Sequence, residues 1–330
     1  MSLIMVVASS LCAGLPMFGF LFFIWWMDRY DREPLWLLAV AFLWGAVGSV
    51  VLAVMASVLL EPMVLALVPL LDGPAWLGET IMPIFVAPLA EEPSKAVILM
   101  LIMWHAHFDN MTDGFVYGAA VGLGFGMTEN FLYFLGSMDD IEMWFLTVLV
   151  RTCYSAVMHA TATAIVGAAL GWARYRGPLY IVVMGTTGLG AALALHGVWN
   201  GLLTFDEILG TAGQLIGLDF LLLFCIALMT TVVFQICLLY ESASIRRELQ
   251  DEASRGLIPS KHPRILSSWM RRNGRTWLEK GIDRKHYISL VTTLAMRKRQ
   301  RTQLGHRASP FYEREIERLR LEIASTLRTD

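Results

Sequence analysis

The sequence has little charge, few cysteines and no recognisable cleavable leader, and each absence narrows the class of protein. Charged residues make up 16% of the 330 residues and hydrophobic residues 56%, which excludes an ordinary soluble globular protein. The four cysteines lie in apolar runs without a CxxC pair, so neither a disulfide framework nor a cysteine-based metal site is expected. Residues 1–27 lack the basic start and the small-residue cleavage site of a signal peptide, so we expect them to form a retained membrane span.

What the sequence has instead is a series of long apolar runs. A helix needs about 20 apolar residues to cross the hydrocarbon core of a bilayer. We therefore predict an all-α fold, a polytopic membrane helical bundle of about seven transmembrane helices with a small helical cytoplasmic tail. The predicted spans are residues 3–27, 35–60, 79–104, 114–136, 143–172, 179–204 and 208–239.

The charged residues divide the chain into two parts and suggest an orientation. Residues 241–330 hold 20 of the 26 Lys and Arg residues, whereas residues 1–240 hold 17 of the 28 Asp and Glu residues. We expect a transmembrane bundle over 1–240 and a basic cytoplasmic helical tail over 241–330. Arginines in the first and fifth loops fall on the side of this tail, so the positive-inside rule places the N-terminus outside the cell membrane. The expected partner is the lipid bilayer, and no nucleic acid is expected.

The third predicted span contains two adjacent carboxylates, Glu91 and Glu92, in the middle of the stretch IFVAPLAEEPSKAVILMLIMW. One ionisable side chain at that depth costs about 2.5–3.5 kcal/mol on insertion scales, so such residues usually mark a functional site. Lys95 follows Glu91 by four residues and is expected to pair with it, which would leave Glu92 the less compensated acid. Pro93 cannot donate a hydrogen bond to the carbonyl of Leu89, so we expect the helix to be loosened at the glutamates.

Small residues recur every four positions in the next three spans, and each row contains polar side chains. Such rows mark the face at which a neighbouring membrane helix can approach closely. We therefore expect Asn130, His159, His196 and Asn200 to face the bundle interior, with Glu129 beside Asn130. The rows are Gly114, Gly118, Gly122, Gly126 and Asn130; Arg151, Ser155, His159, Thr163, Gly167 and Gly171; and Gly188, Ala192, His196 and Asn200.

The depths of the polar residues predict one shared site. At a rise of about 1.5 Å per residue, Glu91, Glu92 and His159 fall near the midplane of the bilayer. Glu129 and His196 fall somewhat nearer the outer face, so one water-accessible pocket, open from the outside or laterally, can contain all five.

These residues also have structural interpretations. The Glu91–Lys95 pair can simply stabilise the third span, and His196 and Asn200 can form interhelical hydrogen bonds. We give Arg151 a supporting role, either paired with an acid or extended toward the interface.

Four of these segments resemble the motifs of the PrsW family of intramembrane proteases. They are EEPSK in one span, DGFVYGAAVGLGFGMTEN in the next, the histidine of MHATATAIVGAALG, and HGVWN in a fourth, and they occur in the order of the family. That family belongs to the superfamily of the CAAX prenyl-protein-processing proteases and the scaffold subunit of gamma-secretase. The resemblance covers about residues 80–205 and leaves the tail outside the shared core.

The resemblance implies hydrolysis of a peptide bond in a membrane-anchored protein, within or at the edge of a bacterial cell membrane. By family analogy, the expected substrates are single-span regulators such as anti-sigma factors, or small secreted peptides. The resemblance maps the family's catalytic positions onto Glu91, Glu92, Glu129, His159, His196 and Asn200, and Lys95 and Asn130 are expected to have supporting roles.

Two mechanisms are open at this point. In the first, a glutamate of the EE pair deprotonates water, His196 and Asn200 stabilise the oxyanion, and His159 orients the water or protonates the leaving amine. In the second, His159, His196 and Glu129 bind Zn²⁺, and a glutamate of the pair is the base. The family is usually described as metalloproteases, but the sequence has no HExxH, and related enzymes have been argued to use glutamate without metal.

Two other classes of function are weighed against the protease. A non-catalytic scaffold for single-span partners occurs in the superfamily, but a scaffold need not retain both glutamates together with the HxxxN pair. A proton-coupled transporter would also bury carboxylates and histidines at the midplane. Such transporters usually show an internal repeat, and the sequence has no second copy of the EEPSK or EN segments.

Overall fold

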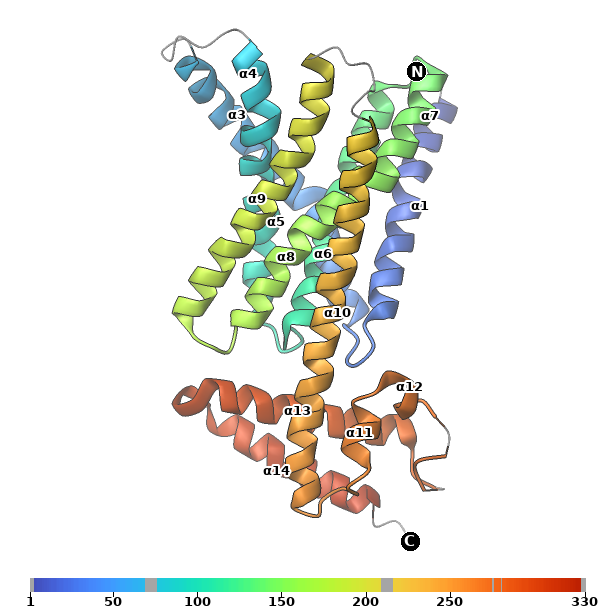
Figure 1. The fold of residues 1–330 in the computed structure, drawn as a ribbon, viewed down its shortest axis with the longest axis vertical. Coiled ribbons are helices and arrows are strands. Elements are labelled where there is room, and N and C mark those ends of the chain that lie inside the picture. The colour runs from blue at the N-terminus through green and yellow to red at the C-terminus, as the bar shows by residue number, and fades with distance from the viewer. Residues whose placement is uncertain (1–2, 69–75, 209–215, 275, 280, 328–330) are drawn as a thin grey trace.

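The computed structural model describes residues 3–68, 76–208, 216–274, 276–279 and 281–327. Over these residues all regular secondary structure is helical and no strand occurs, which confirms the all-α prediction. Figure 1 shows the helices of the first two thirds of the chain packed as an elongated bundle, with the remaining helices gathered beneath it. The N-terminus and the tail lie at opposite ends of the molecule.

The bundle is built from long helices, three of which pass through a π-helical segment. These segments, labelled η, interrupt the continuous helices over residues 35–67, 76–102 and 141–173 without ending them. The bundle elements are α1 (Leu3–Met27), α2 (Leu35–Leu43), η1 (Trp44–Ser49), α3 (Val50–Leu67), α4 (Trp76–Ile81), η3 (Met82–Val86), α5 (Ala87–Ile102), α6 (Met111–Gly136), α7 (Ile141–Val150), η4 (Arg151–Ser155), α8 (Ala156–Ala173), α9 (Pro178–Ile208) and α10 (Ile216–Ser254).

Length and composition identify several membrane-spanning helices, as expected for a multi-pass membrane protein. Among the described residues, five helices are long and apolar enough to cross a bilayer. Helix α6 and the continuous helix 76–102 pack among them, but their glycines and charged residues keep them out of this set. The predicted count of seven therefore remains a prediction. The five are residues 3–27, 35–67, 141–173, 178–205 and 224–254.

The tail follows the bundle without an interruption of the helix. Helix α10 runs for 39 residues and continues past the predicted domain boundary at residue 240 into the tail. No Gly or Pro occurs between Leu218 and Arg255, so no helix-breaking residue stops the helix at the edge of the bundle. Two short helices follow α10 in the tail. The other tail elements are α11 (His262–Leu266), α12 (Trp269–Arg272), α13 (Arg284–Leu304), the short 3₁₀ helix η5 (Gly305–Arg307) and α14 (Pro310–Leu327).

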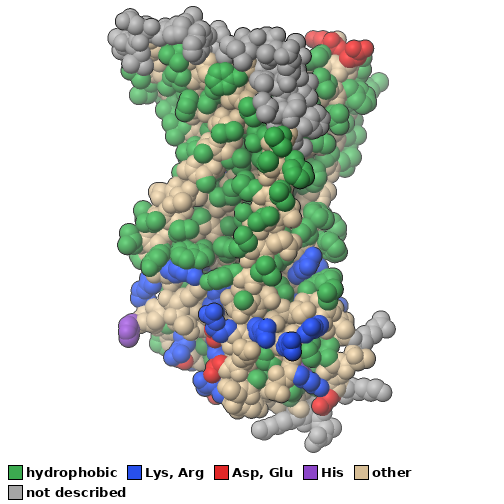
Figure 2. Space-filling view, in the orientation of Figure 1, with side chains coloured by type: hydrophobic (Ala, Val, Ile, Leu, Met, Phe, Trp, Pro, Cys, Tyr) green, Lys and Arg blue, Asp and Glu red, His purple; other side chains and the backbone are tan. Residues whose placement is uncertain are grey.

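The tail has a hydrophobic core of its own. Buried side chains of α10, α13 and α14, among them Leu249, Leu294 and Ile323, form a cluster separate from that of the bundle. Figure 2 shows the same division at the surface, where hydrophobic side chains cover the bundle and Lys and Arg gather beneath it. The domain boundary at residue 240 remains a prediction.

The glycine rows bring α6 and α8 into backbone contact. A Cβ atom at Gly114 would lie 2.0 Å from the carbonyl oxygen of Gly167, and one at Gly122 would lie 2.2 Å from that of His159. A side chain larger than hydrogen therefore cannot fit at these positions without moving the helices apart. This close approach fixes the backbone of His159 against α6 and explains why the row carries glycine.

Candidate active site

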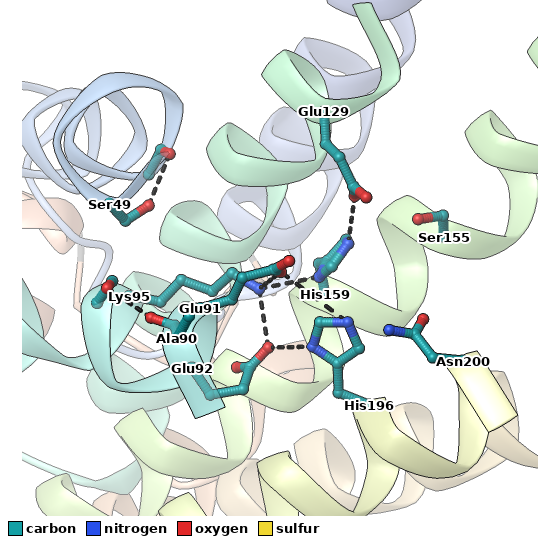
Figure 3. Close-up of polar contacts among 12 residues, drawn as sticks. Ser49, Ala90, Glu91, Glu92, Lys95, Glu129, Ser155, His159, His196 and Asn200 are labelled. Atoms are coloured by element: carbon teal, nitrogen blue, oxygen red, sulfur yellow. Dashed lines mark hydrogen bonds and ion pairs between the residues drawn. The ribbon is translucent and has the colours of Figure 1, made fainter. Parts of the chain in front are cut away.

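The residues selected from the sequence converge inside the bundle. Figure 3 shows their side chains pointing toward one another from α5, α6, α8 and α9. The predicted interior orientation of the polar rows is therefore observed. The residues brought together are Glu91, Glu92, Lys95, Glu129, His159, His196 and Asn200.

Glu92 is fully buried and is held by two neighbours. Its Oε1 lies 2.8 Å from Lys95 Nζ and 2.8 Å from His196 Nδ1. Glu91 Oε2 is farther from the ammonium, at 3.3 Å. Lys95 therefore pairs with Glu91 as expected, but the expectation that this pairing leaves Glu92 the less compensated acid is wrong. The physical reason is that His196, which comes from a different helix, fixes Glu92 next to the lysine.

Glu91 faces open space. A cavity of about 590 Å³ lies beside it, and the side chain of Glu91 is 17% exposed, whereas that of Glu92 is 0% exposed. The second nitrogen of His196, Nε2, lies 3.9 Å from Glu91 Oε2. Glu91 and His196 therefore face each other, and one oxygen atom of a water or a substrate can hydrogen-bond to both side chains.

His159 uses both of its ring nitrogens. Its Nδ1 lies 3.0 Å from Lys95 Nζ, and its Nε2 lies 2.6 Å from Glu129 Oε2. An ammonium has no lone pair and can only donate, so Nδ1 accepts and Nε2–H donates to Glu129. Figure 3 shows this sequence of contacts leading from Glu92 through Lys95 to Glu129.

Arg151 completes the network on the far side of Glu129. Its Nη2 lies 2.8 Å from Glu129 Oε1. Its Nε donates to Asn130 Oδ1 at 3.1 Å, and Asn130 Nδ2 donates back to the Arg151 carbonyl at 3.3 Å. The guanidinium also lies over the ring of Tyr133, 3.5 Å from its centroid. Of the two arrangements expected for Arg151, pairing with an acid and extension toward the interface, the structure shows the first.

Asn200 lines the cavity, and its amide has a backbone partner. Asn200 Nδ2 donates to the carbonyl of Pro83 in η3 at 2.8 Å. Pro88, five residues after Pro83, has no N–H, so it cannot supply the bond that a π-helix would place at that carbonyl. The irregular backbone therefore lies in η3, before the glutamates, whereas Pro93 lies inside the regular helix α5.

Several residues at the site were not chosen as candidate site residues from the sequence. Ser155, Tyr133 and Trp199 line the cavity, and the ring of Phe125 lies 3.8 Å from Lys95 Nζ. The spacing in the sequence could have identified two of them. Ser155 is one turn from His159 on the same polar row, and Tyr133 is one turn after Glu129. An aromatic residue such as Phe125 or Trp199 gives no such signal, because most aromatic residues in membrane helices simply pack.

One group of side chains presents metal-ligand atoms that lie within 4.8 Å of one another: Glu91, Glu92, His159 and His196. Imidazole and carboxylate are ligands that zinc accepts. In the observed arrangement, however, Lys95 Nζ contacts three of the four residues. A metal ion in this group would meet the charge of that ammonium and a His159 without a free ring nitrogen, so the contacts do not fit a bound ion. Glu129, which the sequence analysis included as a ligand, is instead bonded to His159 and Arg151.

Comparison with known proteins places the chain in a family. A family model described as PrsW family intramembrane metalloprotease matches residues 33–234, a wider region than the 80–205 expected from the motifs. The chain is similar to Protease PrsW of Bacillus subtilis (strain 168), with 30% identity over 200 residues, 60% of this chain and 83% of that protein. It is also similar to Protease PrsW of Geobacillus kaustophilus, with 31% identity over 201 residues, 60% of this chain and 81% of that protein.

Protease PrsW of Clostridioides difficile is 33% identical over 135 residues, which cover 40% of this chain and 53% of that protein. No solved structure matches the chain. The family match spans every residue of the converging site described above. The chain therefore belongs to the PrsW family of intramembrane proteases.

Proposed function

We propose that Glu91 is the general base with which this protease hydrolyses a peptide bond of a membrane-anchored protein. The observation that carries the assignment is that Glu91 lines the cavity, whereas Glu92 is fully buried. A general base must come within hydrogen-bond reach of the water that it deprotonates. Glu92 serves instead to hold Lys95 and His196 in place.

The position of His196 suits a hydrogen-bond donor to the reacting carbonyl oxygen. His196 donates through Nδ1 to Glu92, and its Nε2 faces Glu91. With that nitrogen protonated, His196 can donate a hydrogen bond to a developing oxyanion.

The reaction then proceeds in two steps. Glu91 takes a proton from water as the water oxygen attacks the carbonyl carbon of the scissile bond. The oxyanion accepts hydrogen bonds from His196 and from the second amide hydrogen of Asn200. Glu91 returns its proton to the leaving amine as the C–N bond breaks. His159 has no free nitrogen for these transfers, so we assign it to positioning Lys95 and Glu129.

We propose that this reaction needs no metal ion in this chain. Lys95 already supplies a positive charge to Glu91, Glu92 and His159, the side chains that would otherwise bind a metal. The alternative, in which Zn²⁺ binds to this group, requires the lysine to move away.

The position of the cavity and of the basic loops supports an assignment of the site to one side of the membrane. The cavity-lining residues Pro83, Tyr133 and Thr204 belong to the ends of their helices that point away from the tail. The arginine-containing loops lie at the tail, since Arg307 of η5 donates to the carbonyl of Arg176 at 2.9 Å. By the positive-inside rule, we propose an external N-terminus, a cytoplasmic tail, and cleavage in the outer half of the bilayer. Single-span regulators such as anti-sigma factors, or small secreted peptides, fit this placement by family analogy.

The test is cleavage of candidate single-span proteins by the full chain in lipid vesicles. We expect Glu91→Gln to lower the cleavage rate by about 10²- to 10⁴-fold while substrate still co-purifies with the protein. Glu92→Gln should slow cleavage less, because it removes a positioning contact and leaves the base intact. Equal cleavage of a bound substrate by wild type and Glu91→Gln would show that Glu91 is not the base. If Glu91→Gln, Glu92→Gln and the double variant all cleaved substrate as fast as wild type, neither glutamate could be the general base.

A further inference from the structure

A groove lies between α6 and α7 next to the cavity beside Glu91, and the mechanism above does not use it. Its volume is about 460 Å³, and we call it the α6–α7 groove. Figure 1 shows α7 at the end of the bundle opposite the tail. The residues that line the groove are Leu132, Tyr133, Gly136, Ser137 and Thr147.

Tyr133 connects the α6–α7 groove to the active site. It lines both the groove and the cavity beside Glu91, and it is 53% exposed. The guanidinium of Arg151 lies over its ring, 3.5 Å from the centroid, and is itself paired with Glu129 at 2.8 Å. The two cavities are therefore neighbours with one side chain between them, and a peptide bound beside Glu91 can continue past Tyr133 into the groove.

The lining of the groove is apolar in its chemistry. None of its described side chains carries a charge. The hydroxyl of Ser137 donates to the carbonyl of Tyr133 at 3.1 Å, and that of Thr147 donates to the carbonyl of Met143 at 2.7 Å, so both hydrogens are used within their own helices. A polar or charged group that entered the groove would lose its water without gaining an equivalent partner. The groove therefore favours an apolar side chain.

Gly136 keeps the groove open. A Cβ atom added at Gly136 would meet no atom within 4 Å, in contrast to Gly114 and Gly122, which pack against α8. Gly136 also lies in a regular helix, where its backbone does not require glycine. Since a larger side chain at this position would occupy the groove, glycine leaves room there for the side chain of a ligand.

The spacing along α6 sets the distance between the groove and the cleaved bond. Tyr133 and Gly136 follow Glu129, which lines the active-site cavity, by four and seven residues. At a rise of about 1.5 Å per residue, they lie about 6 and 10 Å farther along the helix. An extended peptide advances by about 3.3–3.6 Å per residue, so this separation corresponds to about two or three residues of substrate.

A second apolar groove lies between η3 and α9, with Phe85 and Phe205 in its lining. No described residue lines both this groove and the active-site cavity. The hydrogen bond from Asn200 to the carbonyl of Pro83 also joins the two elements between them. Continuity with the active site therefore favours the α6–α7 groove as the place where substrate binds.

We propose that the α6–α7 groove binds an apolar side chain of the protein substrate, two or three residues from the scissile bond. This side chain lies on the side of the bond that is farther from the tail. The assignment rests on the proposed function, since it takes the cleaved bond to lie beside Glu91. The groove then selects substrates by sequence, because a side chain of the size of Leu or Phe contacts Leu132 and Tyr133, whereas Asp or Lys finds no charged partner there.

The first test is the sequence preference of the full-length chain in lipid vesicles. The probe is a library of single-span proteins randomised at both ends of the span, and cleaved and uncleaved members are sequenced. In the cleaved members, we expect Leu, Met or Phe to be enriched about tenfold over Asp or Lys two or three residues from the cleaved bond. The enrichment should occur only on the side of the bond that faces away from the tail.

Variants of Gly136 test whether the groove causes this preference. Gly136→Leu fills the groove and should remove the preference while cleavage continues, and Gly136→Ala should shift it toward smaller apolar residues. The matched control is Gly190→Leu on α9, where an added Cβ also meets no atom within 4 Å, and it should keep the preference of wild type. The assignment would be overturned if wild type showed no preference, or if Gly136→Leu kept it.

A second test does not depend on cleavage and so separates the groove from the identity of the base. The photoreactive residue p-benzoylphenylalanine replaces Leu132 in a chain that also carries Glu91→Gln, and the chain is irradiated with the same library. Crosslinks should map to library residues near the end of the span that faces away from the tail. The control position is Leu101, which is 62% exposed on α5 and should crosslink mainly to lipid.

The two tests distinguish failure of the groove from failure of the proposed base. Equal crosslinking of the library from positions 132 and 101 would show that substrate does not bind in the groove, whichever glutamate is the base. Specific crosslinks from position 132, together with full activity of Glu91→Gln, would support the groove and exclude Glu91 as the base.

Discussion

At the scale of single residues, Lys95 organises the site. Its ammonium contacts Glu91, Glu92 and His159, and it lies over the ring of Phe125. A buried cation with this many partners is well compensated, whereas removal of one partner leaves an unpaired charge. The lysine thus fixes the positions of Glu91, Glu92 and His159. Without it, the two carboxylates would repel each other, or the three side chains could bind a metal ion.

This arrangement predicts that the purified chain is active without bound metal. We expect less than stoichiometric zinc by elemental analysis, and unchanged cleavage of a single-span substrate after treatment with a chelator. The physical reason is that the ammonium of Lys95 holds the ligands that zinc would need. His159→Ala and His196→Ala are the controls. Stoichiometric zinc that is lost in both variants, together with chelator-sensitive cleavage, would contradict the metal-free mechanism.

Arg151 is expected to act as a positioning residue. Arg151→Gln removes the charge that holds Glu129 against His159, so kcat should fall by about 10- to 100-fold with little change in KM. Arg151→Lys should recover part of this loss, because lysine can still pair with Glu129 but cannot also bind Asn130 and Ser155. Steady-state kinetics over a range of pH would show whether the substitutions change kcat or KM. A change in KM alone would show that Arg151 binds substrate instead.

At the scale of elements, the π-helical segments are the distinctive feature. Such segments often occur at functional sites, since they leave backbone groups without their usual partners. Each of the three here offers a carbonyl to a polar side chain of a neighbouring helix. The pairs are Ala46 with Thr128 at 2.7 Å, Pro83 with Asn200 at 2.8 Å, and Arg151 with Asn130 at 3.3 Å. Two of the donors flank Glu129, so the irregular backbone fixes the helix that carries this acid.

The contact between α6 and α8 predicts a strong effect of one added methyl group. Gly122→Ala should destabilise the bundle by about 1–3 kcal/mol, because the Cβ would lie 2.2 Å from the carbonyl oxygen of His159. Gly136→Ala on the same helix is the matched control, since no atom lies within 4 Å of its added Cβ. There the change should be neutral or stabilising by up to about 1 kcal/mol. Thermal unfolding in detergent would compare the two, and equal unfolding temperatures would show that the helices separate without cost.

At the scale of the whole molecule, two hydrophobic cores share one helix. Helix α10 contributes Phe234 to the core of the bundle and Leu249 to that of the tail. Contacts such as those of Arg307 and Tyr30 add polar links across the junction. The tail can therefore lose its packing while the bundle remains folded, and a probe of the tail alone is needed to detect this.

The tail should lose stability at acidic pH because of His262. Burial lowers the pKa of His262 to about 4, and its Nδ1 lies 2.8 Å from the hydroxyl of Tyr287. The unfolded tail then binds a proton at the ordinary histidine pKa near 6.5, while the folded tail stays neutral down to about pH 4. The stability of the tail should consequently fall by at most about 3 kcal/mol as the pH drops through this window.

Hydrogen exchange of the amides in α13, measured in the full chain, would follow this loss. His262→Gln cannot titrate and serves as the control, so its exchange should depend much less on pH. The same acid-induced exchange in both proteins would show that another group is responsible.

The class of protein, the family and the candidate site residues were all predictable from the sequence alone. The cost of burying charge in lipid marked Glu91, Glu92 and Lys95 as functional, and the four-residue rows oriented His159 and His196 inward. Both signals are local, since they depend on the residue type and on helical periodicity alone.

The separate roles of those residues depend on how the helices pack against one another. Adjacent helical residues such as Glu91 and Glu92 point about 100° apart, and the rotation of α5 against α9 decides which of them faces the cavity. The same packing lets Asn200 donate to the carbonyl of Pro83 and Thr112 donate to Glu241, which lies 129 residues later. No local pattern encodes these contacts, because each depends on the side chains of a helix distant in sequence.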